Sequence, residues 1–139
     1  MSSHCKNEKN SIDVVAAIIF YNNKILAAQR FYSTDLYTSL KFEFPGGKVK
    51  NNEELLTALK RELSEELDLK VKNFTYYFYN KFIYPNKIVN LYFYKCKIQN
   101  LNLKLKVHKC FKLLSIDKLR DVEWLEGDYL VIKKLEKEF

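Results

Sequence analysis

The sequence predicts an α+β fold: a mixed, mostly antiparallel sheet packed against two helices. Apolar, β-branched runs bounded by Asn, Gly and Pro predict the strands. Apolar residues recurring at helical spacing predict one strong helix over 53–67 and a second over 128–139. No repeat or linker divides the 139 residues, so we expect one domain over 11–139 behind a flexible tail, 1–10.

The first two strands form the clearest pair. The run DVVAAIIFY (13–21) predicts a buried strand, Asn22-Asn23 predicts a turn, and KILAAQR (24–30) predicts a returning strand. Further elements are expected as follows: a loop over 31–41, an extended piece over 42–44, a break at Pro45-Gly46-Gly47, strands over 71–84, 87–98 and 111–115, a hairpin turn at Pro85-Asn86, and one helical turn over 116–119.

Composition excludes several classes of protein. Apolar residues make up 47% of the chain and aromatic residues 15%, which argues against disorder. No apolar run approaches the roughly 20 residues that cross a bilayer, and the first residues lack an apolar signal region, so we expect a cytoplasmic protein. Three cysteines without CxxC spacing argue against disulfides and structural zinc. We expect Cys96 and Cys110 to be buried, and His4 and His108 to lie on the surface.

The net charge of +7 comes from lysines scattered along the chain. We expect a lysine-rich surface that attracts polyanionic small molecules, with no membrane partner and no stable nucleic-acid complex. A monomer and a homodimer both remain open.

The helix over 53–67 gathers carboxylates on one side. A helical wheel groups the apolar residues in one arc, namely Leu55, Leu56, Leu59, Leu63 and Leu67. Arg61, Glu62, Glu65 and Glu66 share another arc with Ala58. Like charges at this spacing destabilise a helix by roughly 0.2–0.5 kcal/mol per pair. A solvated face would explain the Arg61–Glu65 pair, whereas a hard divalent cation would explain the crowded carboxylates. The pattern alone leaves both open.

The residues before this helix favour the interpretation as a metal site over that of a solvated helix face. Paired glycines at Gly46-Gly47 allow close backbone approach, so loop carbonyls could join the carboxylates. Glu53 could cap the helix, or shape the loop and pair with Arg61 two turns later.

These spacings resemble the Nudix box, with eight of its nine fixed positions present: Gly47, Glu53, Arg61, Glu62, Leu63, Glu65, Glu66 and Leu69. The likeness to MutT-like nucleoside triphosphate pyrophosphohydrolases extends over roughly 12–137. It includes VVAAIIFYNNKILAAQR, FEFPGGKV, FIYPNKIVNLYFY and EWLEGDYLVIKKL. The chain is therefore identified as a Nudix hydrolase, and the resemblance implies the Nudix α/β/α sandwich.

The resemblance also implies a site. Glu62, Glu65, Glu66 and the Gly46 carbonyl would bind Mg²⁺, for which Mn²⁺ could substitute. Arg61 would orient a glutamate, and Glu53 would support the loop. The implied substrate contacts are Arg30 near the phosphates, Lys87 on the hairpin, and Phe44 and Asp128 at the base.

Two positions depart from the family pattern. Asp68 replaces a glycine that would end the helix in a left-handed conformation, which Asp tolerates better than most residues. Many relatives carry a glutamate in the loop before the last strand, where this chain has Val107 or His108. Either a box glutamate would then act as the base, or the loop aligns with the family in a different register.

The resemblance implies hydrolysis of a (d)NTP to a (d)NMP and diphosphate, with 8-oxo-dGTP as the leading substrate. The alternatives are a (d)CTP or modified-cytidine triphosphate pyrophosphohydrolase, and a non-catalytic nucleotide-binding or regulatory Nudix domain. An ionised Asp128 only accepts hydrogen bonds, from a guanine-type base or from the cytosine amine, so it does not decide between the bases.

Overall fold

The computed structural model describes residues 10–139, which form a single mixed sheet with helices on both faces. The seven strands are β1 (Asn10–Tyr21), β2 (Lys24–Gln29), β3 (Phe42–Glu43), β4 (Gly46–Lys48), β5 (Thr75–Tyr84), β6 (Lys87–Lys97) and β7 (Cys110–Leu114). Their order is β3-β2-β1-β6-β5, with β4 beside β1 and β7 beside β2. Only β1 and β6 pair in parallel among the described strands, which confirms the predicted mixed sheet. Most of the expected tail lies outside the described residues.

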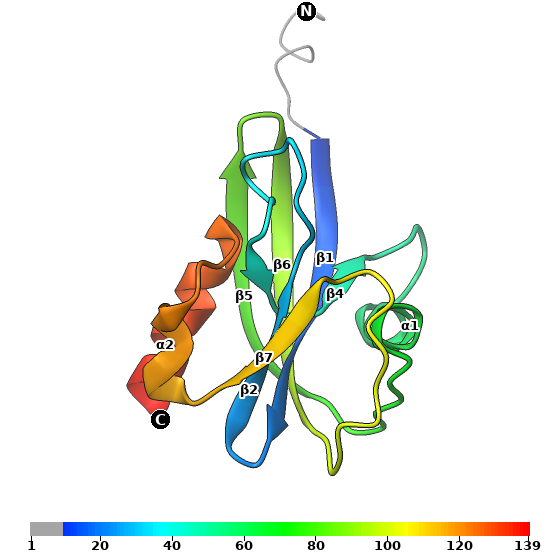
Figure 1. The fold of residues 1–139 in the computed structure, drawn as a ribbon. Coiled ribbons are helices and arrows are strands. Elements are labelled where there is room, and N and C mark those ends of the chain that lie inside the picture. The colour runs from blue at the N-terminus through cyan, green and yellow to red at the C-terminus, as the bar shows by residue number, and fades with distance from the viewer. Residues whose placement is uncertain (1–9) are drawn as a thin grey trace, which may run out of the picture.

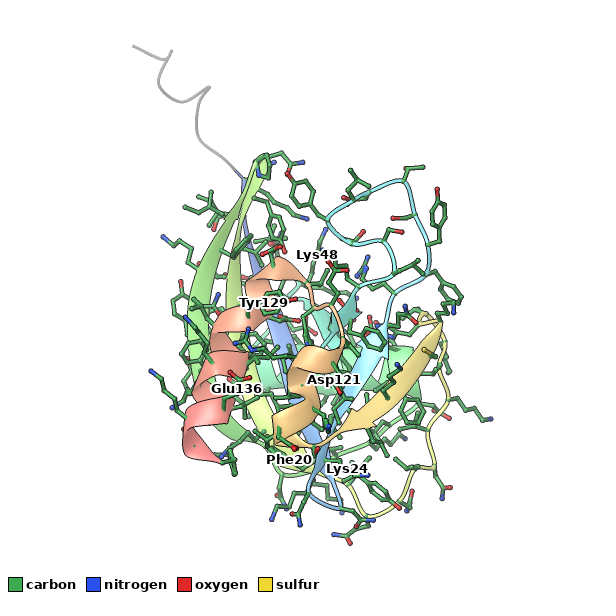
Figure 2. The ribbon with its side chains drawn as sticks, turned by 60° about the vertical axis from the view of Figure 1, so that its left-hand side comes forward. Phe20, Lys24, Lys48, Asp121, Tyr129 and Glu136 are labelled. Atoms are coloured by element: carbon green, nitrogen blue, oxygen red, sulfur yellow. The ribbon has the colours of Figure 1, made fainter. Side chains whose placement is uncertain are left out.

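The two main helices are α1 (Leu55–Leu67) and α2 (Tyr129–Glu138), and Figure 1 shows them on opposite faces of the sheet. This arrangement is the expected α/β/α sandwich. Short 3₁₀ helices occupy Ile116–Asp121 and Glu126–Asp128. Figure 2 shows the first of these beside α2. Over residues 10–139, no helix is long and apolar enough to cross a membrane.

Each sheet face buries its own apolar cluster. Successive β1 side chains alternate between the faces, so that Ile18 packs on the α2 side and Ile19 on the α1 side. Trp124 and Leu135 belong to the first cluster, and Leu63 to the second. Burial on both faces explains why β1 is a continuous apolar run rather than an alternating one.

The structure corrects several predicted boundaries. Helix α1 begins at Leu55 because Glu53 lies in a turn, where its backbone N–H donates to the Lys50 carbonyl at 3.0 Å. Strand β5 begins at Thr75 rather than at Val71. The expected break at Gly46-Gly47 is strand β4, because both glycines pair with β1.

The predicted apolar arc of α1 is also wrong at one residue. Leu56 is 40% exposed, whereas Ala58 is fully buried. The helix is turned so that Ala58, Glu62 and Glu66, four residues apart, face the protein interior or the adjoining cleft.

Asp68 ends α1 in the expected left-handed conformation, with φ 52° and ψ 39°. Its N–H donates to the Ser64 carbonyl, and the Leu69 N–H donates to the Leu63 carbonyl. Replacing Asp68 by glycine should therefore raise the free energy of unfolding by about 1 kcal/mol, since glycine adopts this conformation without strain. Urea unfolding would measure the change. Asp68→Asn is the matched control, because it removes only the charge at the helix end; an equal gain from Asn would assign the effect to the helix dipole instead.

Candidate active site

A cleft of about 950 Å³ lies at the end of β1 that contains Ile12 and Val14. Strand β4, helix α1 and the β5–β6 hairpin contribute to its walls. The predicted site residues that line it are Arg30, Phe44, Gly46, Glu62, Glu66, Lys87 and Asp128. A larger hollow of about 1200 Å³ lies at the opposite end of β1, around Phe20, and no Asp, Glu or His side chain lines it. Figure 2 labels Phe20 near that hollow and Lys48 near the cleft. Of these two hollows among the described residues, the cleft is the one that combines carboxylates with basic side chains.

The two glycines of β4 bring the backbone against its neighbours. Gly46 pairs with Ala16 of β1, and a Cβ on Gly46 would lie 1.9 Å from the Val15 carbonyl oxygen. A Cβ on Gly47 would lie 2.3 Å from the Glu62 carboxyl carbon. The glycines thus leave room for the sheet on one side and for the Glu62 carboxylate on the other.

Arg61 connects the carboxylates of this region. Its Nε and Nη2 donate to both oxygens of Glu53, at 2.8 and 3.0 Å, which is the expected pair. Its Nη1 donates to Glu62 at 2.9 Å and to Glu65 at 3.0 Å. Nη2 also donates to the Lys48 carbonyl of β4. Arg61 therefore fixes α1 to the glycine-rich segment and orients two carboxylates.

These contacts shift the pKa values of the partners. The hydrogen bond from Arg61 lowers the pKa of Glu53 to about 2, helped by the Lys50 backbone N–H. The same bond to Glu53 raises the pKa of Arg61 above its ordinary value. Glu53 thus shapes the loop as an ionised acceptor, and it does not cap the helix through its side chain.

Glu66 has a different environment. Burial, followed by the negative charges of Glu43 and Glu62, raises its pKa to about 8. Its Oε1 is buried without a hydrogen-bond partner among the described residues. A buried carboxylate oxygen that lacks a donor is the feature that a bound cation would relieve.

The donor set fits a hard divalent cation in part. Glu62 and Glu66 line the cleft beside Gly46, and their carboxylate oxygens are of the type that Mg²⁺ prefers over soft metals. Glu65 is not among the residues that line the cleft, and 56% of its side chain is exposed. Within residues 10–139, no three Asp, Glu, His or Cys side chains form a ready-made metal cluster. The cleft therefore brings together two of the three box glutamates and leaves Glu65 aside.

Phe44 and Asp128, the two residues expected to contact the nucleobase, are both buried. Phe44 is 3% exposed, and its ring stacks on Trp124 with ring centroids 4.5 Å apart. Its backbone N–H donates to Asp128 Oδ2 at 3.4 Å. Burial, followed by the charge of Glu43, raises the pKa of Asp128 well above its ordinary value. Asp128 is thus biased towards the protonated form, which donates one hydrogen bond as well as accepting others.

Sequence reasoning missed two residues of the cleft region. His108 was expected on the surface, but only 2% of its side chain is exposed, because its Nε2 contacts Glu43 Oε2 at 2.7 Å. Glu43 lines the cleft and also accepts a hydrogen bond from Arg30. The sequence feature that could have indicated Glu43 is its position directly before Phe44 in the segment FEFPGGKV. Cys96 is buried as expected, whereas Cys110 is half-buried and donates to Gln29. His4 lies outside the described residues.

Comparisons with known proteins agree with this geometry. Residues 11–135 match the NUDIX domain. The 8-oxo-dGTP diphosphatase of Buchnera aphidicola subsp. Schizaphis graminum is 35% identical over 128 residues, which cover 90% of this chain and 93% of that relative. The CTP pyrophosphohydrolase of Escherichia coli K12 is 50% identical over 58 residues, or 42% of each chain. The crystal structure of MutT protein from Methanosarcina mazei Go1 has a TM-score of 0.82 at 23% identity and covers 94% of this chain and 96% of that one.

The family match spans nearly all the described residues, and the M. mazei likeness supports the same fold. Nudix hydrolases generally depend on a divalent cation and act on small nucleotide substrates. On these grounds the chain belongs to the NUDIX domain family, as a MutT-like Nudix hydrolase.

Proposed function

We propose that the protein is an Mg²⁺-dependent nucleoside triphosphate pyrophosphohydrolase whose preferred substrate is 8-oxo-dGTP. The observation that carries the proposal is one cleft lined by Glu62 and Glu66 together with Arg30 and Lys87. A triphosphate carries about four negative charges, which basic side chains and a cation neutralise. The products would be the (d)NMP and diphosphate.

Glu62, Glu66 and the Gly46 carbonyl would hold the ion, with Glu65 as a further ligand and Mn²⁺ as a substitute. When bound, the ion neutralises phosphate charge and lowers the pKa of bound water. Arg61 orients Glu62 and Glu65, and Glu53 holds Arg61 in place. Because no acidic residue occurs between Asp68 and Asp117, we infer that a box glutamate with an oxygen not used by the ion would accept the proton.

The base would be read by Asp128, which Phe44 holds through its backbone N–H. A protonated carboxyl presents one donor and one acceptor side by side. That pair matches the O6 acceptor and N7–H donor of 8-oxoguanine. It also matches the N3 acceptor and amine donor of cytosine, so (d)CTP is the second candidate, supported by the similarity to the E. coli CTP pyrophosphohydrolase.

A substrate panel tests the proposal. Diphosphate release with Mg²⁺ should give the highest kcat/KM for 8-oxo-dGTP when compared with dGTP, dCTP, CTP, dATP and UTP. A maximum at dCTP or CTP would replace the substrate while keeping the reaction. Tight nucleotide binding without turnover of any triphosphate would contradict the proposal and favour a regulatory domain.

A further inference from the structure

The Glu43 carboxylate is held from two sides. Its Oε1 accepts a hydrogen bond from Arg30 Nη1 at 3.3 Å, and its Oε2 lies 2.7 Å from His108 Nε2. Only 12% of the Glu43 side chain and 2% of the His108 side chain are exposed. Three segments far apart in sequence, the residue after β2, strand β3 and the loop before β7, therefore meet at one carboxylate.

The chemistry of the imidazole fixes the direction of the contact. An ionised carboxylate only accepts hydrogen bonds, so His108 Nε2 must carry the proton and donate it. His108 Nδ1 is buried and has no partner among the described residues. An unpaired buried polar atom is unfavourable. The bond to Glu43 is thus the interaction that explains a buried histidine at this position.

The loop that carries His108 is fixed by its backbone. The N–H groups of Lys104 and Lys106 donate to the carbonyls of Leu67 and Glu66 at the end of α1. The N–H of Lys109 donates to the Gln29 carbonyl of β2 at 2.8 Å. Hydrogen bonds on both sides of His108 therefore set the direction from which its ring reaches Glu43.

Glu43 also lies next to the groups that would contact the substrate. Its negative charge contributes to the raised pKa values of both Glu66 and Asp128. Glu43 therefore lies within electrostatic range of a proposed metal ligand and of the residue proposed to contact the nucleobase. The Arg30 guanidinium carries five N–H donors. One of them is engaged by Glu43, and the side chain is 44% exposed at the cleft. The remaining donors can face a phosphate.

We propose that His108 is a positioning residue: it fixes Glu43, and Glu43 in turn fixes Arg30 towards the substrate phosphates. This inference rests on the proposed function. It gives the loop before β7, which has no carboxylate in this chain, an indirect part in substrate binding.

Two substitutions at His108 separate positioning from packing. His108→Leu fills the space but removes the donor, and it should raise KM for the best triphosphate about tenfold with kcat within about threefold, because one charge-assisted hydrogen bond is lost. His108→Gln places an amide N–H donor near the Nε2 position and should return KM to within about threefold of wild type. Lys109→Ala, on the exposed neighbour, is the matched control and should leave KM unchanged.

Binding provides a readout independent of turnover. The probe is a triphosphate whose scissile bridging oxygen is replaced by a methylene group. In calorimetric titration, the wild-type protein and the His108→Gln variant should bind it tightly, whereas the His108→Leu variant should bind it weakly. Unchanged KM and affinity in a folded His108→Leu protein would overturn the proposal, as would a loss that Gln does not rescue.

If His108→Leu does not fold, Glu43→Gln carries the test, because it keeps the shape and removes the charge that faces Arg30. A KM rise of about tenfold is expected, and an unchanged KM would overturn the proposal. Failure of the His108 proposal differs from failure of the proposed function. In the second case, the wild-type protein itself would hydrolyse no triphosphate.

Discussion

Replacing Glu66 by glutamine is expected to lower kcat by at least about a hundredfold, a loss comparable to removing one preorganised charge-stabilising group from an active site. The same change should abolish most of the rise in Tm that Mg²⁺ produces in the wild-type protein. Both follow from the position of Glu66 in the cleft and from its buried, unpaired Oε1. Mg²⁺ at about 100 times its Kd would stabilise the wild-type protein by roughly 2.7 kcal/mol.

The stabilisation should depend on pH with a definite sign. Burial raises the pKa of Glu66 from 4.5 to about 8. Without a cation, the folded protein therefore keeps a proton that the unfolded chain has released, and this contribution to stability is full below pH 4.5 and lost as pH rises through 8. A cation requires the ionised carboxylate. The Mg²⁺-dependent rise in Tm should thus be larger at high pH than at low pH.

Thermal unfolding at about pH 5.5 and about pH 8.5, with Mg²⁺ or with EDTA, would measure both effects. Glu54→Gln is the matched control, because Glu54 is an exposed carboxylate immediately before the same helix. A Glu66→Gln protein that Mg²⁺ stabilises as much as wild type would refute the assignment of Glu66 as a metal ligand.

Adding one methyl group at Gly46 is expected to destabilise the fold by about 3 kcal/mol or more. The new Cβ would lie 1.9 Å from the Val15 carbonyl oxygen and 2.7 Å from the Ala16 Cα, both backbone atoms of the central strand β1. Neither atom can move without disturbing the β1–β4 pairing. Urea unfolding of Gly46→Ala should show the loss, or the variant should fail to accumulate as folded protein.

Gly47→Ala is the matched comparison one residue later, and its expected result is different. The new Cβ meets the Glu62 carboxylate, the far end of a side chain that can rotate away. The free energy of unfolding should fall by less than about 1.5 kcal/mol, whereas kcat should fall strongly because a proposed metal ligand is displaced. A Gly46→Ala protein as stable as Gly47→Ala would contradict this account.

The sequence by itself predicted the class of fold and much of the site. The continuous apolar run of β1, the hairpin around Pro85-Asn86 and the stripe of α1 are local patterns that reflect burial, and the structure contains each of them. The sequence also predicted the ion pair of Glu53 with Arg61. It did not predict the reason, because Glu53 reaches Arg61 from the turn before α1 rather than from the helix itself. The left-handed conformation of Asp68 likewise followed from its position at the helix end.

Tertiary structure alone decided the rest, because those features depend on contacts between distant segments. His108 has no helical partner that would mark it, and it is buried through Glu43, 65 residues earlier in the chain. Asp128 is biased towards its protonated form because folding buries it beside Glu43, which composition does not reveal. The difference between the exposed Glu65 and Glu66 in the cleft depends on how α1 is turned on the sheet. Local periodicity fixes which side chains share a face, whereas burial and charge proximity are set only when the strands and loops pack together.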